Sequence, residues 1–175
     1  MTPSRSEEVF AVQTFLPYPD FNRSAQVLDD KRLGKQRVEC LQIMHVLIGL
    51  RWNVSLEVIE EFTPRGWRNH PAVLMWTGCE DSLLDYQRSV CAVWASRGFH
   101  DTCYAKSVGL MARWWDEGGT GSARPSWLGD VALHRSHQSN LIRKAPAIYR
   151  PLFPGVPDDL PYIWPAGNTA ANQGV

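Results

Sequence analysis

Residues 28–50 read LDDKRLGKQRVECLQIMHVLIGL, and this stretch decides the fold class. Its first half is rich in charged side chains, whereas its second half is too apolar for a helix at the surface. We therefore predict a long helix from about Arg23 to Leu50 whose second half crosses the core. Asn22 or Asp20 is the expected N-cap, and Asp29-Asp30 marks an expected break.

Three further helices are predicted downstream, over about 71–97, 102–115 and 130–144. Pro71 suits a first helical position, and Gly98 suits a stop. Asp130 suits an N-cap, and Ala145-Pro146 should end the last helix.

No segment shows the alternating pattern of a strand, so the sequence predicts an all-α fold. We expect a compact single-domain helical bundle with two long central helices and a coil rich in proline and aromatic residues over 149–165. The domain should cover 13–165, between a flexible extension at 1–12 and a flexible tail at 166–175.

The composition narrows the class of protein. No apolar run reaches the roughly 18 residues needed to cross a bilayer, and we expect a cytoplasmic protein with no membrane partner. The four cysteines, at 40, 79, 91 and 103, lack metal-finger spacing and are expected to be reduced and structural. Equal numbers of basic and acidic residues argue against nucleic-acid binding by bulk charge, but a local basic face stays open.

The first candidate site is a polar stripe on the helix predicted at about 23–50. At helical spacing its members are Arg32, Lys35, Gln36, Glu39 and Gln42. Glu39 falls where the helix enters the core, so burial should raise its pKa while nearby cations lower it. Two interpretations are open: a functional acid, or a surface ladder of Lys35–Glu39 ion pairs.

The second candidate site is RGWRNHP, residues 65–71, at the expected start of the helix over 71–97. Arg68, Asn69 and the first amides of that helix would form a phosphate site. The alternative is a polar loop in which His70 caps the helix.

The third candidate site is HRSHQSNLIRK, residues 134–144, on the last predicted helix. It offers many donors and no acid, which suits contact with phosphates through side chains such as Asn140, Arg143 and Lys144. A metal site at His134 and His137 is the weaker alternative, because a third ligand is missing. The sequence contains no phosphate-binding glycine loop and no dinucleotide fingerprint, so no cofactor is expected.

In their order along the chain, these features resemble the endonuclease V-type pyrimidine-dimer DNA glycosylases, which are small all-helical base-excision enzymes. The resemblance rests on residues 30–33 with Glu39, on residues 70–99 ending in Arg-Gly-Phe, and on residues 140–153 with their basic helix and aromatic tail.

The resemblance implies a mechanism and a set of site residues. The family attacks the sugar carbon of the damaged nucleotide with its own N-terminal amine, and the resulting imine permits strand cleavage. Glu39 matches the family's catalytic glutamate, and Gln13-Thr14 match the family's start, so the resemblance implies that Glu39, Thr14 and Gln13 are the catalytic residues. The expected DNA-binding residues are Arg32, Lys35, Arg37, Arg68, His70, His137, Asn140, Arg143 and Lys144.

The family-like start lies behind twelve further residues, and this leaves three sources of a nucleophile open. Thr2, exposed after removal of methionine, would have to reach back to the site. Val12 would be the true start if its codon were GTG read as methionine, and the amine would then belong to that residue or to Gln13. In the third case Glu39 activates water and there is no lyase step.

We therefore expect a monomeric DNA repair glycosylase that excises a damaged or modified base from duplex DNA, with lyase activity as a further step. Two other classes are kept as alternatives. One is a non-catalytic module that binds nucleic acid or protein, in which Glu39 is dispensable. The other is a hydrolase of nucleosides or another glycosidic substrate.

Overall fold

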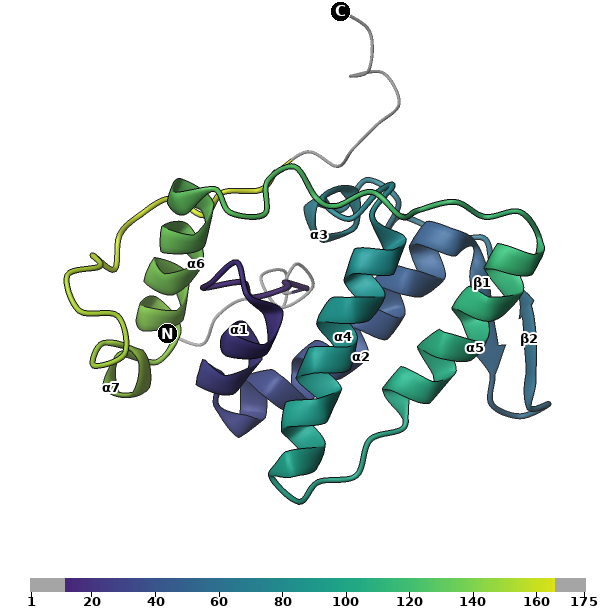
Figure 1. Cartoon of the computed structure of the whole chain (residues 1–175), viewed down its shortest axis with the longest axis horizontal. Helices are drawn as coiled ribbons and strands as arrows, with labels where there is room; N and C mark the ends of the chain where they lie inside the picture. Colours follow the sequence, from purple (N-terminus) through teal and green to yellow (C-terminus); the bar gives the residue numbers. More distant parts are fainter. Residues whose placement is uncertain (1–11, 166–175) are drawn as a thin grey trace, which may run out of the picture.

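The computed structural model describes residues 12–165, and this part of the chain is mostly helical (Figure 1). Of the ends predicted to be flexible, residues 1–11 and 166–175 lie outside the described residues, whereas Val12 is buried in the hydrophobic core. The helices are α1 (Phe21–Val27), α2 (Asp30–Ile48), α3 (Pro71–Leu74), α4 (Glu80–Ser96), α5 (Cys103–Asp116), α6 (Val131–Lys144) and α7 (Pro146–Tyr149). The strands are β1 (Leu50–Asn53) and β2 (Val58–Glu61).

The predicted break in the first helix is confirmed. Asp20 caps α1 by accepting a hydrogen bond from the Arg23 amide at 2.7 Å, and extended backbone at Leu28 ends that helix. Arg97, at the end of α4, donates to the Leu28 carbonyl and to Asp30, both at 2.8 Å. The break between α1 and α2 is thus held by a side chain from a distant helix.

The prediction of one continuous helix over 71–97 is wrong. Pro71 does occupy a first helical position, but Gly78 adopts a left-handed φ of 74° that a helix cannot continue through. The Glu80 carboxylate then accepts a hydrogen bond from the Gly78 amide at 3.1 Å, and α4 starts there. The chain therefore forms a four-residue helix, a turn and a 17-residue helix.

The all-α prediction is wrong at one place, where β1 and β2 form an antiparallel hairpin. Each strand has only four residues, which is too short for a clear alternation in the sequence. Arg51 pairs with Glu60 across the strands at 2.6 Å. Arg113 of α5 donates to the Ile59 carbonyl at 2.6 Å, so the hairpin is stabilised by the helix beside it (Figure 1).

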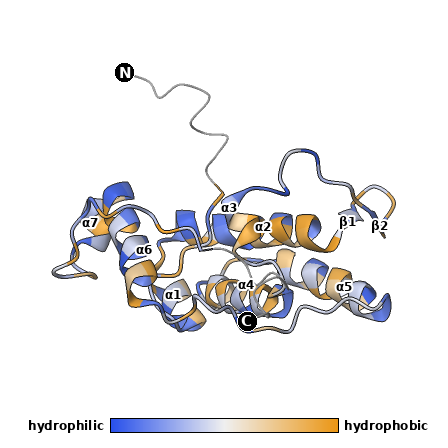
Figure 2. Cartoon of the chain, turned by 90° about the horizontal axis from the view of Figure 1, so that it is seen from above, coloured by the Kyte–Doolittle hydropathy of each residue, from blue (hydrophilic) through white to orange (hydrophobic). Residues whose placement is uncertain are grey.

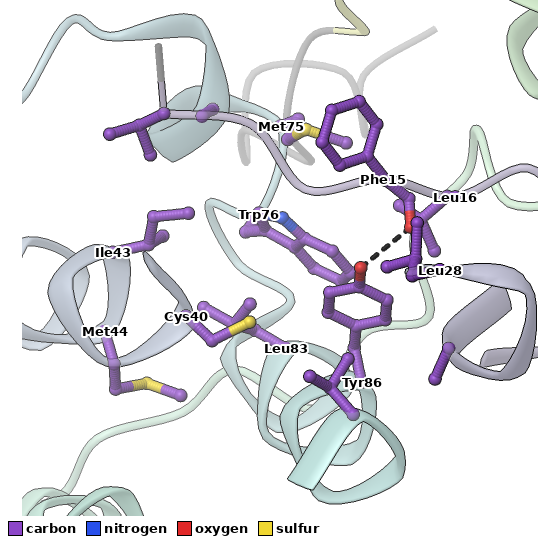
Figure 3. Close-up of a cluster of buried hydrophobic side chains, with 14 of the residues drawn as sticks. Phe15, Leu16, Leu28, Cys40, Ile43, Met44, Met75, Trp76, Leu83 and Tyr86 are labelled. Atoms are coloured by element: carbon purple, nitrogen blue, oxygen red, sulfur yellow. Dashed lines mark hydrogen bonds between the residues drawn. The ribbon is translucent and has the colours of Figure 1, made fainter. Parts of the chain in front are cut away.

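The apolar half of α2 lies in the interior, as predicted, and packs against α4 and α5 (Figure 2). Trp76 is fully buried, stacked on Tyr86 with 5.8 Å between ring centroids and edge-on to Trp127 at 5.1 Å. Figure 3 shows the rings of Trp76 and Tyr86 among the side chains of α2 and residues 15–16. The four cysteines are free and buried. No helix within residues 12–165 is both long and apolar enough to span a bilayer.

The two last predicted helices agree with the structure to within a residue. α5 begins after Thr102, and α6 has Asp130 as its N-cap, which accepts from the Ala132 amide at 2.9 Å. Ala145 ends α6, but Pro146 then starts the short α7, which was not expected. The coil after α7 returns along α6, where Ser136 and Ser139 accept hydrogen bonds from its amides.

Candidate active site

Glu39 lines a pocket of about 190 Å³ whose walls carry four cationic side chains. The pocket lies where the helix α2 passes the N-terminal segment and the end of α6. Its lining comprises Gln13, Phe15, Lys31, Arg32, Lys35, Gln36, Glu39 and Lys144. The sequence stripe from Arg32 to Glu39 is therefore one wall of a pocket, while Gln42 lies outside it.

The Glu39 carboxylate is nearly inaccessible to solvent, with 4% of its side chain exposed. Gln36 Nε2 donates to Glu39 Oε2 at 2.7 Å, and Lys35 Nζ lies 3.4 Å from Oε1. Burial raises the pKa of Glu39 to about 7, against the opposing effects of Lys35 and of a hydrogen bond from the Gln13 amide. Glu39 thus exists in both protonation states near neutral pH, which suits an acid–base group.

Buried side chains hold the extended segment at residues 13–17 against α2. Gln36 binds it twice, accepting from the Phe15 amide at 2.9 Å and donating to the Gln13 carbonyl at 2.6 Å. The Tyr86 hydroxyl donates to the Phe15 carbonyl at 2.7 Å (Figure 3). These bonds fix the position of the Gln13 backbone nitrogen beside Glu39.

The two histidines of α6 bind this same segment. Leu16 donates its amide to His137 Nδ1 at 3.0 Å, and its carbonyl accepts from His134 Nδ1 at 2.7 Å. Burial lowers the pKa of His137 to about 3, so the ring stays neutral and accepts. A fully buried ring offers a phosphate no surface, so the structure does not place His137 where its predicted DNA contact requires. No cluster of three metal-ligating side chains occurs within the described residues.

Thr14, predicted as a catalytic residue, is fully buried. Its hydroxyl accepts from Trp76 Nε1 at 3.1 Å and donates to Met75 Sδ at 3.4 Å. These bonds give Thr14 a structural role that anchors the segment, whereas Gln13 is the residue of the pair that lines the pocket.

The predicted DNA-binding cations do not all gather in one place. Arg32 and Lys35 line the pocket, although Arg32 also pairs with Asp29 at 2.9 Å. Arg37 lies away from the pocket, where it pairs with Asp101 at 2.5 Å and covers the Trp94 ring at 4.4 Å. Its contacts are those of a residue that stabilises the packing of α2 on α4 and α5.

The structure gives little support to the predicted phosphate site at residues 65–71. His70 Nδ1 accepts from the Ala72 amide at 3.1 Å, so His70 caps the helix, as the alternative interpretation had it. The helix is only four residues long, so it carries little dipole. Arg68 is exposed and lines a separate surface groove with Glu80.

The polar side chains of α6 do not all face the Glu39 pocket. Arg143 donates to the carbonyls of Asp158 and Leu160 at 2.8 and 2.9 Å, and so holds the C-terminal coil. Asn140 Oδ1 is buried and has no hydrogen-bond partner among residues 12–165. Of the four predicted DNA contacts on this helix, Lys144 alone lines the Glu39 pocket.

Sequence reasoning missed Tyr162, which comes from the C-terminal coil. Its ring stacks on His137 with centroids 4.4 Å apart, and its hydroxyl lies 3.5 Å from the Thr14 carbonyl. Burial and the nearby Glu39 carboxylate raise the pKa of Tyr162. The only signal for it was the aromatic richness of the tail, which does not say which ring returns to the site.

The pocket combines one buried carboxylate of raised pKa with a cationic rim, an arrangement suited to acid–base chemistry on an anionic ligand. Residues 12–107 match the profile of a family described as pyrimidine dimer DNA glycosylase. Because the match covers more than half of the chain, the protein belongs to this family of DNA repair enzymes, as the sequence features predicted. No curated protein and no solved structure matches the chain with significant similarity.

Proposed function

We propose that the protein excises the damaged base at pyrimidine dimers in duplex DNA, with Glu39 as its central acid–base group. The observation that carries this proposal is the Glu39 pocket, in which a carboxylate with a pKa near 7 lies between cations. Family membership supports the substrate class. Glu39 also lies within the matched residues.

The chemistry follows from the bond that must break. As the bond between the base and the sugar C1′ lengthens, positive charge develops on the sugar. An ionised Glu39 stabilises that charge and accepts a proton from the attacking nucleophile. Gln36 and the Gln13 amide hold the carboxylate in place, so little reorganisation is needed during the reaction.

Contact with DNA is assigned to the cationic rim rather than to net charge, which is zero. Lys31, Arg32 and Lys35 on α2 present positive charge around the pocket mouth. Such groups neutralise backbone phosphates and position the duplex without reading its sequence. The damaged nucleotide must leave the base stack to reach Glu39, and weakened stacking at a lesion lowers the energy required.

A lyase step requires an amine in this pocket. In a chain that retains Val12, the Gln13 nitrogen is an amide and is not nucleophilic. In a chain starting at Gln13, the same nitrogen would be an amine beside the Glu39 carboxylate, because the Gln13 amide already bonds to it. An N-terminal amine has a lower pKa than a lysine and is more easily neutral. This geometry supports the family mechanism for a shortened chain.

The test uses a duplex with a single cyclobutane pyrimidine dimer and the matched undamaged duplex. We expect the full-length protein to create alkali-labile sites only in the damaged duplex. Glu39→Gln should lower the single-turnover rate by about 10²–10⁴-fold while duplex binding persists. Glu80→Gln is the matched control, because Glu80 is also buried but is outside the pocket.

Each alternative predicts a different result. Full activity of Glu39→Gln would contradict the proposal. Unimpaired binding without base excision by the wild-type protein would indicate a binding module. Cleavage of free nucleosides with no preference for damaged duplex would indicate the hydrolase.

A further inference from the structure

Lys144, the last residue of α6, lines the pocket opposite the α2 wall. It faces the same space as Glu39, and the charges of the two residues act on each other. Lys144 is exposed, and its ammonium forms no ion pair or hydrogen bond within residues 12–165. An accessible, unpaired amine therefore lies beside the central carboxylate.

The other two lysines of the pocket differ from Lys144 in position. Lys35 Nζ is 3.4 Å from Glu39 Oε1, so Lys35 is already engaged in an ion pair. Lys31 precedes Glu39 by eight residues on the same helix, which is about 12 Å along its axis. Lys144 reaches the pocket from another helix and is free of both restrictions.

The surroundings of Lys144 disfavour its charged form. Partial desolvation by the pocket wall, together with the cations Arg32 and Lys35, lowers the pKa of Lys144, and Arg143 acts in the same direction. Glu39 and the carbonyl end of α6 oppose this but do not outweigh it. A lysine with a lowered pKa is neutral more often and is a better nucleophile.

We propose that the Lys144 ε-amine is the nucleophile of the lyase reaction in the chain that retains residues 1–12, an inference that rests on the proposed glycosylase function. The carboxylate of Glu39 and the amine of Lys144 then form an acid–base and nucleophile pair from α2 and α6. The N-terminal amine is not required in this form.

The steps balance without any oxidant or cofactor. The neutral Nζ attacks C1′ as the C1′–base bond breaks, and the base leaves with the bonding electrons and takes up a proton. Nζ loses a proton to Glu39, which passes it to O4′ as the C1′–O4′ bond breaks, and the opened sugar carries a protonated imine between Nζ and C1′. Removal of a C2′ proton then expels the 3′ phosphate, and water hydrolyses the imine to restore Lys144.

The test is borohydride trapping of the full-length protein on duplex DNA with one abasic site, followed by mass mapping of the cross-linked peptide. We expect the reduced adduct on Lys144. Lys144→Arg, which keeps the charge but cannot form an imine, should lose at least about 100-fold in trapping and in strand cleavage without alkali. Lys106→Arg is the matched control, because Lys106 lies on α5 outside the pocket, and it should retain both.

Glycosidic cleavage is measured separately, as alkali-labile sites on dimer-containing duplex. An adduct on any other residue, or full trapping by Lys144→Arg, would overturn the role of Lys144 and leave the glycosylase proposal standing. Alkali-labile sites with no adduct would show that water is the nucleophile and would also overturn it. Absence of both alkali-labile sites and adduct would overturn the glycosylase proposal itself.

Discussion

Glu39 and Glu80 are both buried glutamates with raised pKa values, yet their surroundings differ. Glu39 lines a pocket with cationic side chains and accepts a hydrogen bond from the Gln13 backbone amide. Glu80 faces backbone: its Oε1 accepts from the Gly78 amide, and its Oε2 has no hydrogen-bond partner among the described residues. A Cβ on Gly121 would lie 2.0 Å from that oxygen.

The difference shows that burial alone does not identify an active site. Desolvation raises the pKa of both carboxyls, but lysines oppose the rise at Glu39, whereas backbone hydrogen bonds oppose it at Glu80. The pocket of Glu39 carries four cationic side chains, whereas the groove beside Glu80 carries one, Arg68. Structural and catalytic carboxyl groups can both have perturbed pKa values, so the two kinds are distinguished by the groups that surround each carboxyl.

The largest expected effect is on the pH dependence of excision. Because the ionised form of Glu39 is required and its pKa is about 7, the single-turnover rate should be roughly 100-fold lower at pH 5 than on the plateau above pH 7. Glu80→Gln should show the same profile. Lys35→Ala should move the midpoint to higher pH, because Lys35 lowers the pKa of Glu39. A flat profile, or a rate that falls with rising pH, would contradict the assignment.

The second expected effect is on stability. Between the ordinary pKa of 4.5 and the folded value of about 7, folded Glu39 retains a proton that the unfolded chain has lost. Stability therefore falls as pH rises through this window, by about 3 kcal/mol in all. Glu39→Gln should remove this fall, so urea denaturation should find it more stable than wild type at pH 8 and by a smaller margin at pH 5. An equal margin at both pH values would refute the burial argument.

A smaller effect on stability is expected from Gly121→Ala, which changes the surroundings of Glu80. The added Cβ would force the carboxylate or its loop to move, at a cost of about 1–3 kcal/mol. Thermal unfolding should shift downward by several degrees, while the excision rate per folded molecule stays unchanged. Loss of activity at unchanged stability would show that the two carboxyl regions are coupled.

The smallest expected effect is on duplex binding, and it distinguishes two cationic residues of α2. Lys31→Ala should weaken binding to all duplexes alike and reduce the salt slope by about one phosphate contact. Arg37→Ala should lower stability instead, because Arg37 pairs with Asp101 and covers Trp94. Binding isotherms at several salt concentrations, beside denaturation curves, measure both. A reduced salt slope for Arg37→Ala would restore its predicted DNA contact.

The sequence predicted those features that depend on neighbouring residues. The stripe that ends at Glu39 followed from the helical repeat, and the break at Asp29-Asp30 followed from local preferences. Helix ends set by Asp130 and Pro71 were likewise local. Such signals need no knowledge of which segments meet in space.

The sequence could not predict features that depend on distant contacts. Arg143 was predicted as a phosphate contact, and nothing in the sequence indicated that it also donates to carbonyls of the returning coil. His137 was placed on DNA, but it binds Leu16, 121 residues away. The hairpin was missed because β1 and β2 gain stability from each other and from α5. Polar residues on a helix face do not reveal whether their partner is solvent, DNA or another part of the chain.

The attachment of residues 13–17 to α6 has a consequence for the order of folding. These are among the longest-range hydrogen bonds in the protein, and closing so large a loop is slow. During synthesis, Glu39 and the segment beside it emerge early, but the histidines at 134 and 137 that hold the segment emerge about 100 residues later. A nascent chain released after residue 107 would contain Glu39 without a completed pocket. Competence for repair should therefore arise only once α6 has docked, so an incomplete chain would not cut DNA prematurely.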